Sequence, residues 1–93
     1  MPPNRNNNFK NPLQKGNRVT IPKLMRWQFK METEQVLKVG VWLPGSYEGW
    51  QFFYAKMDKK GRVLIPLVTL ELISREKKPD LAGQIFDLRI EPA

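Results

Sequence analysis

The 93-residue sequence contains no cysteine and no histidine. Without cysteine there is no disulfide, thiol nucleophile or thiolate metal ligand, and without histidine there is no imidazole to act as a base or to bind a metal. The aspartates and glutamates are scattered, and nothing in the sequence supplies an activated nucleophile. We therefore expect a protein that is not an enzyme and that requires no cofactor or metal.

Long apolar runs are also missing. No segment approaches the ~18 to 20 apolar residues of a membrane span, and the N-terminal MPPNRNNNFKNP lacks the apolar stretch of a secretory signal. These absences predict a cytoplasmic protein that does not contact a membrane. Residues 1–12 hold five Asn and three Pro and few large apolar groups, so we interpret them as a flexible basic arm that precedes a single domain at 13–93.

Acidic residues are absent from the first third of the chain. Residues 1–30 contain seven Lys and Arg and no Asp or Glu, whereas the other 63 residues hold nine basic and nine acidic groups. The formal charge of +7 therefore lies entirely in the first third. A surface with charge of one sign is typical of proteins that bind a polyanion, because neutralised phosphates release their condensed counterions.

An internal repeat organises the rest of the chain. KGNRVTIP at 15–22 aligns with KKGRVLIP at 59–66 at an offset of 44, and QVLKVGV at 35–41 resembles QIFDLRI at 84–90 after a five-residue insertion. We predict two half-repeats, at about 9–43 and 50–91. Each half is expected to contain a strand, a basic turn, a short strand, a helix that begins at proline, a loop and a strand.

The strands and helices of the repeat can be located from their patterns. In the second half, residues 50–57 and 62–65 suit two strands, and the polar turn between them predicts a hairpin with a basic tip. The remaining apolar patterns and helix-starting prolines predict helices at 22–31 and 66–75 and strands at 36–42 and 84–91.

The two predicted helices differ in their surfaces. On a helical wheel Lys23, Arg26 and Lys30 share one narrow arc, so the first helix is expected to show a basic face while its apolar side packs. The second helix is apolar nearly all round and needs cover on more than one side. We therefore expect a contact between chains, a homo-oligomer, through part of Leu67, Leu70 and Ile73.

The aromatic residues favour packing over ligand binding. For Trp27, Phe29, Trp42 and Trp50 the expected role is core or interface packing, because large aromatic side chains are usually buried. The alternative, in which bases stack on exposed rings, stays open for Trp42 and Tyr47 near the turn that joins the two halves.

The paired strings GNRVTIPKLMR and MDKKGRVLIP resemble the signature of the AbrB, SpoVT, MazE and MraZ superfamily of transition regulators. The resemblance covers about residues 9–91. It implies an α+β, mainly β fold in which two β-β-α-β halves interlock as swapped hairpins, forming a small pseudo-dimeric barrel within one chain. In that family, residues of the basic turns and helix starts face DNA, which implicates Lys15, Arg18, Lys23, Arg26, Lys59, Lys60 and Arg62.

Charge and resemblance together predict a transcriptional regulator that contacts double-stranded DNA through its basic turns and first helix, with Lys30 as a further contact. The second half has Leu67 and Leu70 where the first has Lys23 and Arg26, so the first half carries more of the prediction. The alternative is a protein-interaction module, such as an antitoxin-like dimerisation platform. RNA binding is a third hypothesis, although no RNP-like or GXXG string is present.

Overall fold

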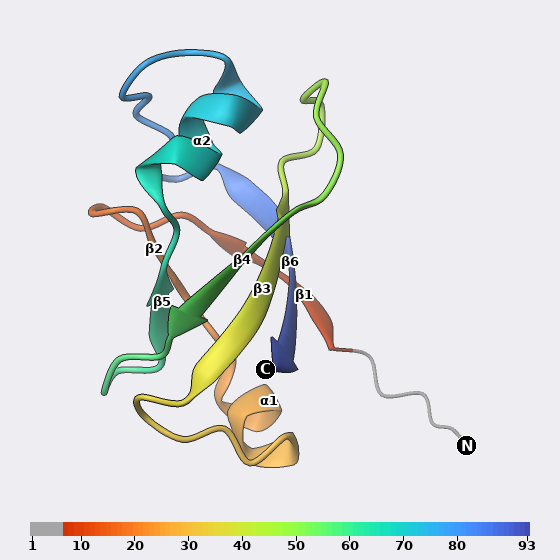
Figure 1. The fold of residues 1–93 in the computed structure, drawn as a ribbon, viewed down its shortest axis with the longest axis vertical. Helices are drawn as coiled ribbons and strands as arrows, with labels where there is room; N and C mark the ends of the chain where they lie inside the picture. The colour runs from red at the N-terminus through yellow and green to blue at the C-terminus, as the bar shows by residue number, and fades with distance from the viewer. Residues whose placement is uncertain (1–6) are drawn as a thin grey trace.

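The computed structural model describes residues 7–93, which form a small α+β domain that is mainly β (Figure 1). Each half of the sequence contributes two strands, a helix and a further strand. In chain order the elements are β1 (Asn8–Pro12), β2 (Arg18–Thr20), α1 (Lys23–Gln28), β3 (Val36–Trp42), β4 (Gln51–Lys56), β5 (Arg62–Leu64), α2 (Leu67–Ser74) and β6 (Ile85–Pro92).

The element order confirms the predicted repeat, and the element bounds differ mainly at α1. Both helices follow a proline, Pro22 or Pro66, whose missing N–H has no partner to lose at a helix start. Helix α1 ends at Gln28, short of the predicted residue 31, because Lys30 adopts φ +52. Lys30 therefore lies beyond the helix. The prediction that Lys30 shares a helical face with Lys23 and Arg26 is wrong.

Strand pairing runs between the halves of the chain. The four-stranded sheet has the order β1-β6-β3-β4, and the two-stranded sheet pairs β2 with β5, all antiparallel. The strands thus form two sheets and are not hydrogen-bonded into one closed barrel. Since β1, β2 and β4 each pair only with a strand of the other half among the described residues, neither half forms a sheet alone.

The register reveals an approximate twofold relation between the halves. Val19 pairs with Val63, which is its own counterpart in the repeat, and Gly40 pairs with its counterpart Arg89. In an antiparallel pair with a local twofold axis, the residue on the axis meets its own equivalent and the flanking residues exchange partners, as Arg18 opposite Leu64 and Thr20 opposite Arg62 do. The strand pairs β2–β5 and β3–β6 therefore each have an approximate local twofold axis.

The turn of the hairpin predicted at 50–65 is present, but its two strands do not pair with each other. The backbone N–H of Asp58 donates to the carbonyl of Arg62 at 2.8 Å and closes the turn, but β4 pairs with β3 and β5 pairs with β2. The alternation of apolar residues fixes which face of a strand is buried, and does not fix the strand with which it pairs.

The flexible arm predicted at 1–12 is wrong for residues 8–12, which form β1 against β6, and residues 1–6 lie outside the described residues. Backbone ladder bonds need no apolar side chains, so an Asn-rich segment can join a sheet. Phe9 packs against the core, and the Asn11 side-chain amide donates to the Thr20 carbonyl at 2.6 Å. These contacts hold residues 8–12 in the sheet, although their composition predicted a flexible segment.

The core lies between the two sheets and contains only apolar side chains among the described residues. On β6 burial alternates, so that Phe86, Leu88 and Ile90 point inward. On α2 the fully buried Leu70 and the nearly fully buried Ile73 belong to this core, so the predicted contact between chains through these two side chains is wrong. Leu67 remains partly exposed at the start of the helix.

Candidate nucleic-acid interface

Basic side chains from both halves of the chain meet at one end of the molecule. Lys23 and Arg26 of α1 and Lys59 of the β4–β5 turn line a hollow of about 200 Å³. Figure 1 shows α1 at the same end as this turn, with α2 at the opposite end. We call this region the α1-end basic surface, and it comprises Lys23, Arg26, Lys59, Lys60 and Arg62.

The α1-end basic surface is held together by contacts between α1 and the turn. The backbone N–H of Ile21 donates to the carbonyl of Gly61 at 2.8 Å, and Arg26 Nε donates to the carbonyl of Ile21 at 3.1 Å. Gly61 has φ +78, and a Cβ built there would lie 2.4 Å from Arg26 Cζ. Glycine therefore supplies both the left-handed turn and the space that the guanidinium fills.

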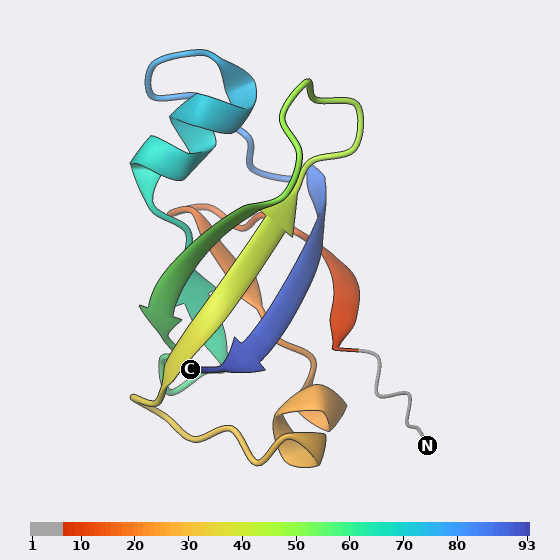
Figure 2. The ribbon, with the colours of Figure 1, turned by 45° about the vertical axis from the view of Figure 1, so that its right-hand side comes forward.

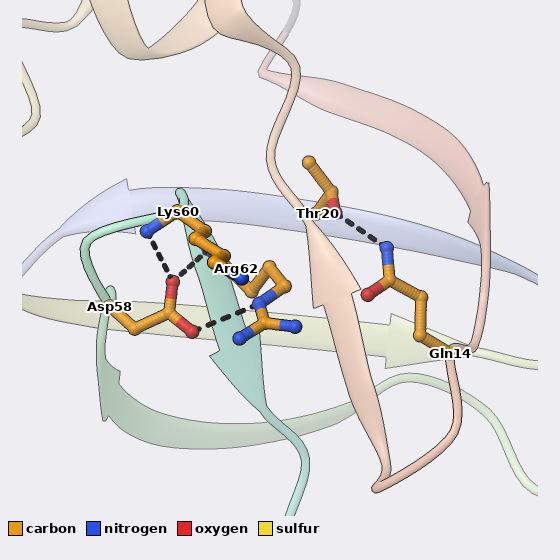
Figure 3. A network of polar contacts seen from close by, with 5 residues as sticks. All are labelled: Gln14, Thr20, Asp58, Lys60 and Arg62. Carbon is orange, nitrogen blue, oxygen red and sulfur yellow. Dashed lines mark hydrogen bonds and ion pairs between the residues drawn. The ribbon is translucent and has the colours of Figure 1, made fainter.

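Asp58 orders the turn that carries Lys59 and Lys60 (Figure 3). Its Oδ1 accepts the backbone N–H groups of Lys60 and Arg62, both at 2.9 Å, and its Oδ2 accepts Arg62 Nε at 3.0 Å. Burial acts to raise the pKa of Asp58, but these hydrogen bonds and the Arg62 charge outweigh it and hold the pKa below its ordinary value. Asp58 thus stays ionised at neutral pH and neutralises Arg62 rather than the lysines.

The remaining lysines of the surface are free to meet an anion. Lys23, Lys59 and Lys60 are exposed, and their ammonium groups have no carboxylate partner within residues 7–93. Asp58 is the one acidic residue that lines the hollow in this described part of the chain. The bordering loop carries Glu32 and Glu34, which limit the positive surface on that side.

Lys15 and Arg18 lie elsewhere, although they were predicted to act with Lys23 and Arg26. In the β2–β5 pair, Arg18 is opposite Leu64, whereas Arg62 lies at the other end opposite Thr20. The turn of Lys15 instead meets the start of α2, where the Ile65 N–H donates to the Asn17 carbonyl at 2.8 Å. The structure therefore divides the predicted cations between the two ends of the molecule.

The two turns are equivalent in the repeat but differ in their polar contacts. Gln14 stands where the second half has Asp58, and its side-chain amide donates to Thr20 Oγ1 at 2.7 Å (Figure 3). The guanidinium of Arg18 therefore has no carboxylate partner in the part of the chain that the structure describes, whereas Arg62 is paired. Arg18 lies against Gly16, where a Cβ would come within 2.9 Å of its Nη1.

The sequence did not indicate how much of α1 is exposed. Trp27 is 74% exposed and Leu24 is 75% exposed, and Met25 is the buried residue of this helix. The expectation that Trp27 packs in the core is wrong within the chain. The expectation that the apolar side of the first helix packs holds for Met25, Phe29 and Met31 and is wrong for Leu24 and Trp27. A helix of six residues has too few turns to present the full wheel on which that expectation was based.

Another hollow, of about 490 Å³, lies between the β3–β4 loop and the end of α2, and its lining is less basic. Its cation, Arg75, donates to Glu48 at 3.0 Å and lies 5.0 Å from the centroid of the Tyr47 ring. Apolar side chains such as Leu43, Ile73 and Leu81 form much of the remaining wall. This hollow is therefore less suited than the one at the α1 end to binding a polyanion.

Comparisons with known proteins concern the fold. No protein-family model matches the chain, and no curated protein matches it. The solution structure of PHS018 from Pyrococcus horikoshii is similar, with a TM-score of 0.73, 19% sequence identity, and coverage of 91% of this chain and 88% of that chain. At this identity the likeness shows a shared fold. Within residues 7–93, no helix is long and apolar enough to cross a membrane.

Proposed function

We propose that this protein is a transcriptional regulator that binds double-stranded DNA through the α1-end basic surface. The observation that carries the proposal is the convergence of Lys23 and Arg26 with Lys59, from opposite halves of the chain, around one hollow. Cations that are brought together at one surface without carboxylate partners attract a phosphate backbone. In this role the protein would act in the cytoplasm, where it meets DNA.

We further propose that the architecture is of the swapped-hairpin, AbrB-like type. Two features support it: the β-β-α-β order occurs twice, and the strands pair across the halves with each of Val19 and Gly40 opposite its repeat counterpart. Under this proposal the basic turn at 58–61 and the start of α1 form one DNA-contacting end. Lys15 and Arg18, at the other end, would contribute through a separate contact or none.

The phosphate contacts predict a measurable salt dependence. Each phosphate contact adds about 0.9 to the slope of log K against log salt concentration for B-form DNA. Changing Lys23, Lys59 and Lys60 together to Gln should therefore lower the slope by about 3 units if each lysine contacts one phosphate. Fluorescence anisotropy with a labelled 20-base-pair duplex across a salt series measures the slope.

A matched control removes three charges elsewhere. Lys15, Lys77 and Lys78 are exposed and lie outside the α1-end basic surface, toward α2, and changing them to Gln makes the same change in net charge. We expect this variant to keep most of the wild-type slope. Equal loss of slope in both triple variants would show that net charge alone drives binding and would contradict the assigned surface.

A protein-interaction module is the second candidate function, favoured by the exposed Leu24 and Trp27 on α1. These two side chains line a shallow hollow with Gln28, and exposed apolar patches mark interaction sites on many proteins. The two functions are separated by Leu24→Ser, which removes apolar surface without changing charge. Under the DNA-binding proposal this variant keeps the salt slope of the wild type.

A further inference from the structure

A row of aromatic side chains lies on the outer face of the four-stranded sheet. The ring centroids of Trp42 and Trp50 are 6.1 Å apart, and those of Trp50 and Phe52 are 6.4 Å apart with planes inclined by 21°. Tyr54 follows Phe52 by two residues on β4 and so projects from the same face. We call these four residues, Trp42, Trp50, Phe52 and Tyr54, the aromatic strip.

The backbone of β3 makes room for the aromatic strip. Gly40 lies opposite Phe52 in the β3–β4 register, and a Cβ built at Gly40 would come within 2.6 Å of the Phe52 ring and 3.3 Å of Trp50. A glycine inside a strand commonly marks such a close approach. The rings of Phe52 and Trp50 are therefore seated against the sheet rather than projecting freely into solvent.

Neither helix of the described chain covers the strip. Phe52 is 53% exposed and Tyr54 is 67% exposed. Figure 2 shows β3, β4 and β6 with their outer face toward the viewer, and neither helix crosses them. The expectation that Trp42 and Trp50 pack in the core is wrong within the chain, because both lie at the surface. A contiguous exposed aromatic patch of this kind marks a binding surface.

The charges around the strip favour an anionic partner. Lys38 Nζ lies 5.1 Å from the centroid of Phe52, and Lys56 ends β4 on the same outer face. The acidic residues on the neighbouring strand β6 are already neutralised, since Asp87 pairs with Lys10 and Glu91 pairs with Arg89. The unneutralised charge along the strip is therefore positive.

We propose that the aromatic strip binds single-stranded nucleic acid by stacking bases on its rings. Such strands combine anionic phosphates with exposed base faces, the two features that lysines and aromatic rings bind. Phe52 and Tyr54 are two residues apart on β4, a separation of about 7 Å, which exceeds the 3.4 Å spacing of stacked bases in a duplex. The strip thus suits bases that are splayed apart, and a duplex does not offer its base faces.

This proposal is independent of duplex binding at the α1 end. Among the described residues, the strip shares no residue with the α1-end basic surface, and the two surfaces belong to different elements. The triple variant with Gln at Lys23, Lys59 and Lys60 should therefore keep its affinity for a single strand within about threefold. If the protein does not bind duplex DNA, the proposal for the aromatic strip is unaffected. If the strip does not bind a single strand, the proposal for duplex DNA is likewise unaffected.

Tryptophan fluorescence gives a direct test with a 12-nucleotide oligothymidylate. In a Trp27→Phe background the emission comes from Trp42 and Trp50, and stacking should quench it in a saturable manner. Tyr54→Ala should raise the dissociation constant roughly 5- to 150-fold, the range that corresponds to losing one stacked base. Phe52→Leu should act similarly while it keeps apolar cover over Gly40.

The control is Tyr47→Ala, which removes an 88%-exposed aromatic ring that lies against Arg75 after α2 and is not on a strand of the sheet. This variant should bind the oligonucleotide as the wild type does, and circular dichroism should report a folded domain for all variants. The proposal is overturned if no quenching occurs, or if Tyr47→Ala and Tyr54→Ala lose affinity equally. It is also overturned if sedimentation reveals a dimer that Tyr54→Ala dissociates while no oligonucleotide binds, because a second copy then occupies the strip.

Discussion

Gly61→Ala tests the contact that joins the two halves at the proposed DNA-binding end. Gly61 has φ +78, and a side chain in the left-handed region costs about 1 to 2 kcal/mol. The new Cβ would also displace the Arg26 guanidinium and break its hydrogen bond to the Ile21 carbonyl, which contributes about 0.5 to 1.5 kcal/mol. The expected loss in unfolding free energy is therefore about 1.5 to 3.5 kcal/mol.

A matched glycine separates the two contributions. Gly83 has φ +88, but a Cβ built there meets nothing within 4 Å, so Gly83→Ala carries the backbone cost alone. Urea unfolding of both variants should give a difference of about 0.5 to 1.5 kcal/mol, with Gly61→Ala the less stable. For a domain of this size, each kcal/mol corresponds to a melting-temperature change of about 4 to 8 °C, so a thermal melt resolves the difference.

A double-mutant cycle identifies the displaced group. In an Arg26→Ala background the guanidinium is absent, and Gly61→Ala should then cost only as much as Gly83→Ala. If Gly61→Ala costs no more than Gly83→Ala in the wild type, or if its extra cost survives the removal of Arg26, the reasoning about this contact is refuted.

Three further predictions follow from burial and charge. Leu70→Ala removes a fully buried side chain and should lower the unfolding free energy by about 2 to 5 kcal/mol, whereas Leu67→Ala on the exposed side of α2 should cost clearly less in the same urea titration. The pKa of Asp58 is lower in the folded state than in the unfolded chain, where it is near 3.9. The ionised carboxylate therefore stabilises the fold fully at pH values above about 3.9, and this stabilisation is lost as the pH falls through the folded-state pKa. The stability difference between the wild type and Asp58→Asn should therefore shrink between pH 5 and the acid limit, and a difference that is constant with pH would contradict the network. Trp27→Phe should remove the most solvent-exposed part of the tryptophan emission and change stability by no more than about 0.5 kcal/mol, and a larger loss in a thermal melt would show that Trp27 packs.

Local signals in the sequence account for the elements that were predicted well. Pro22 and Pro66 each precede a helix, and the apolar run at 36–42 coincides with β3, because helix starts and buried strands depend on residues close together in the chain. The repeat then carries each assignment from one half to the other. The repeat predicted a strand before the first turn, whereas the composition of residues 1–12 predicted a flexible arm. Composition misled there because backbone bonds to β6, nearly eighty residues away, hold the Asn-rich β1 in place.

Which residues form the candidate site depends on which turn contacts which helix. The pairing of the strands decides these contacts. With pairing inside each half, Lys15 and Arg18 would have been expected beside Lys23. Pairing across the halves instead brings the second turn, with Lys59, to the first helix through the Ile21–Gly61 hydrogen bond. Both pairings satisfy the same alternation of apolar residues, so only the tertiary structure distinguishes them.

The same pairing explains why the two equivalent ends have different chemistry. At the α1 end the helix supplies Arg26 and the opposing turn supplies Gly61, whose missing side chain leaves room for the guanidinium. At the α2 end the helix position equivalent to Arg26 is Leu70, which turns into the core, so the opposing turn needs no such room. There Asn17, a residue type that tolerates φ +62, replaces glycine. The two ends therefore differ in both the helix residue and the turn residue. Arg26 with Gly61 leaves a cation at the surface, whereas Leu70 with Asn17 does not.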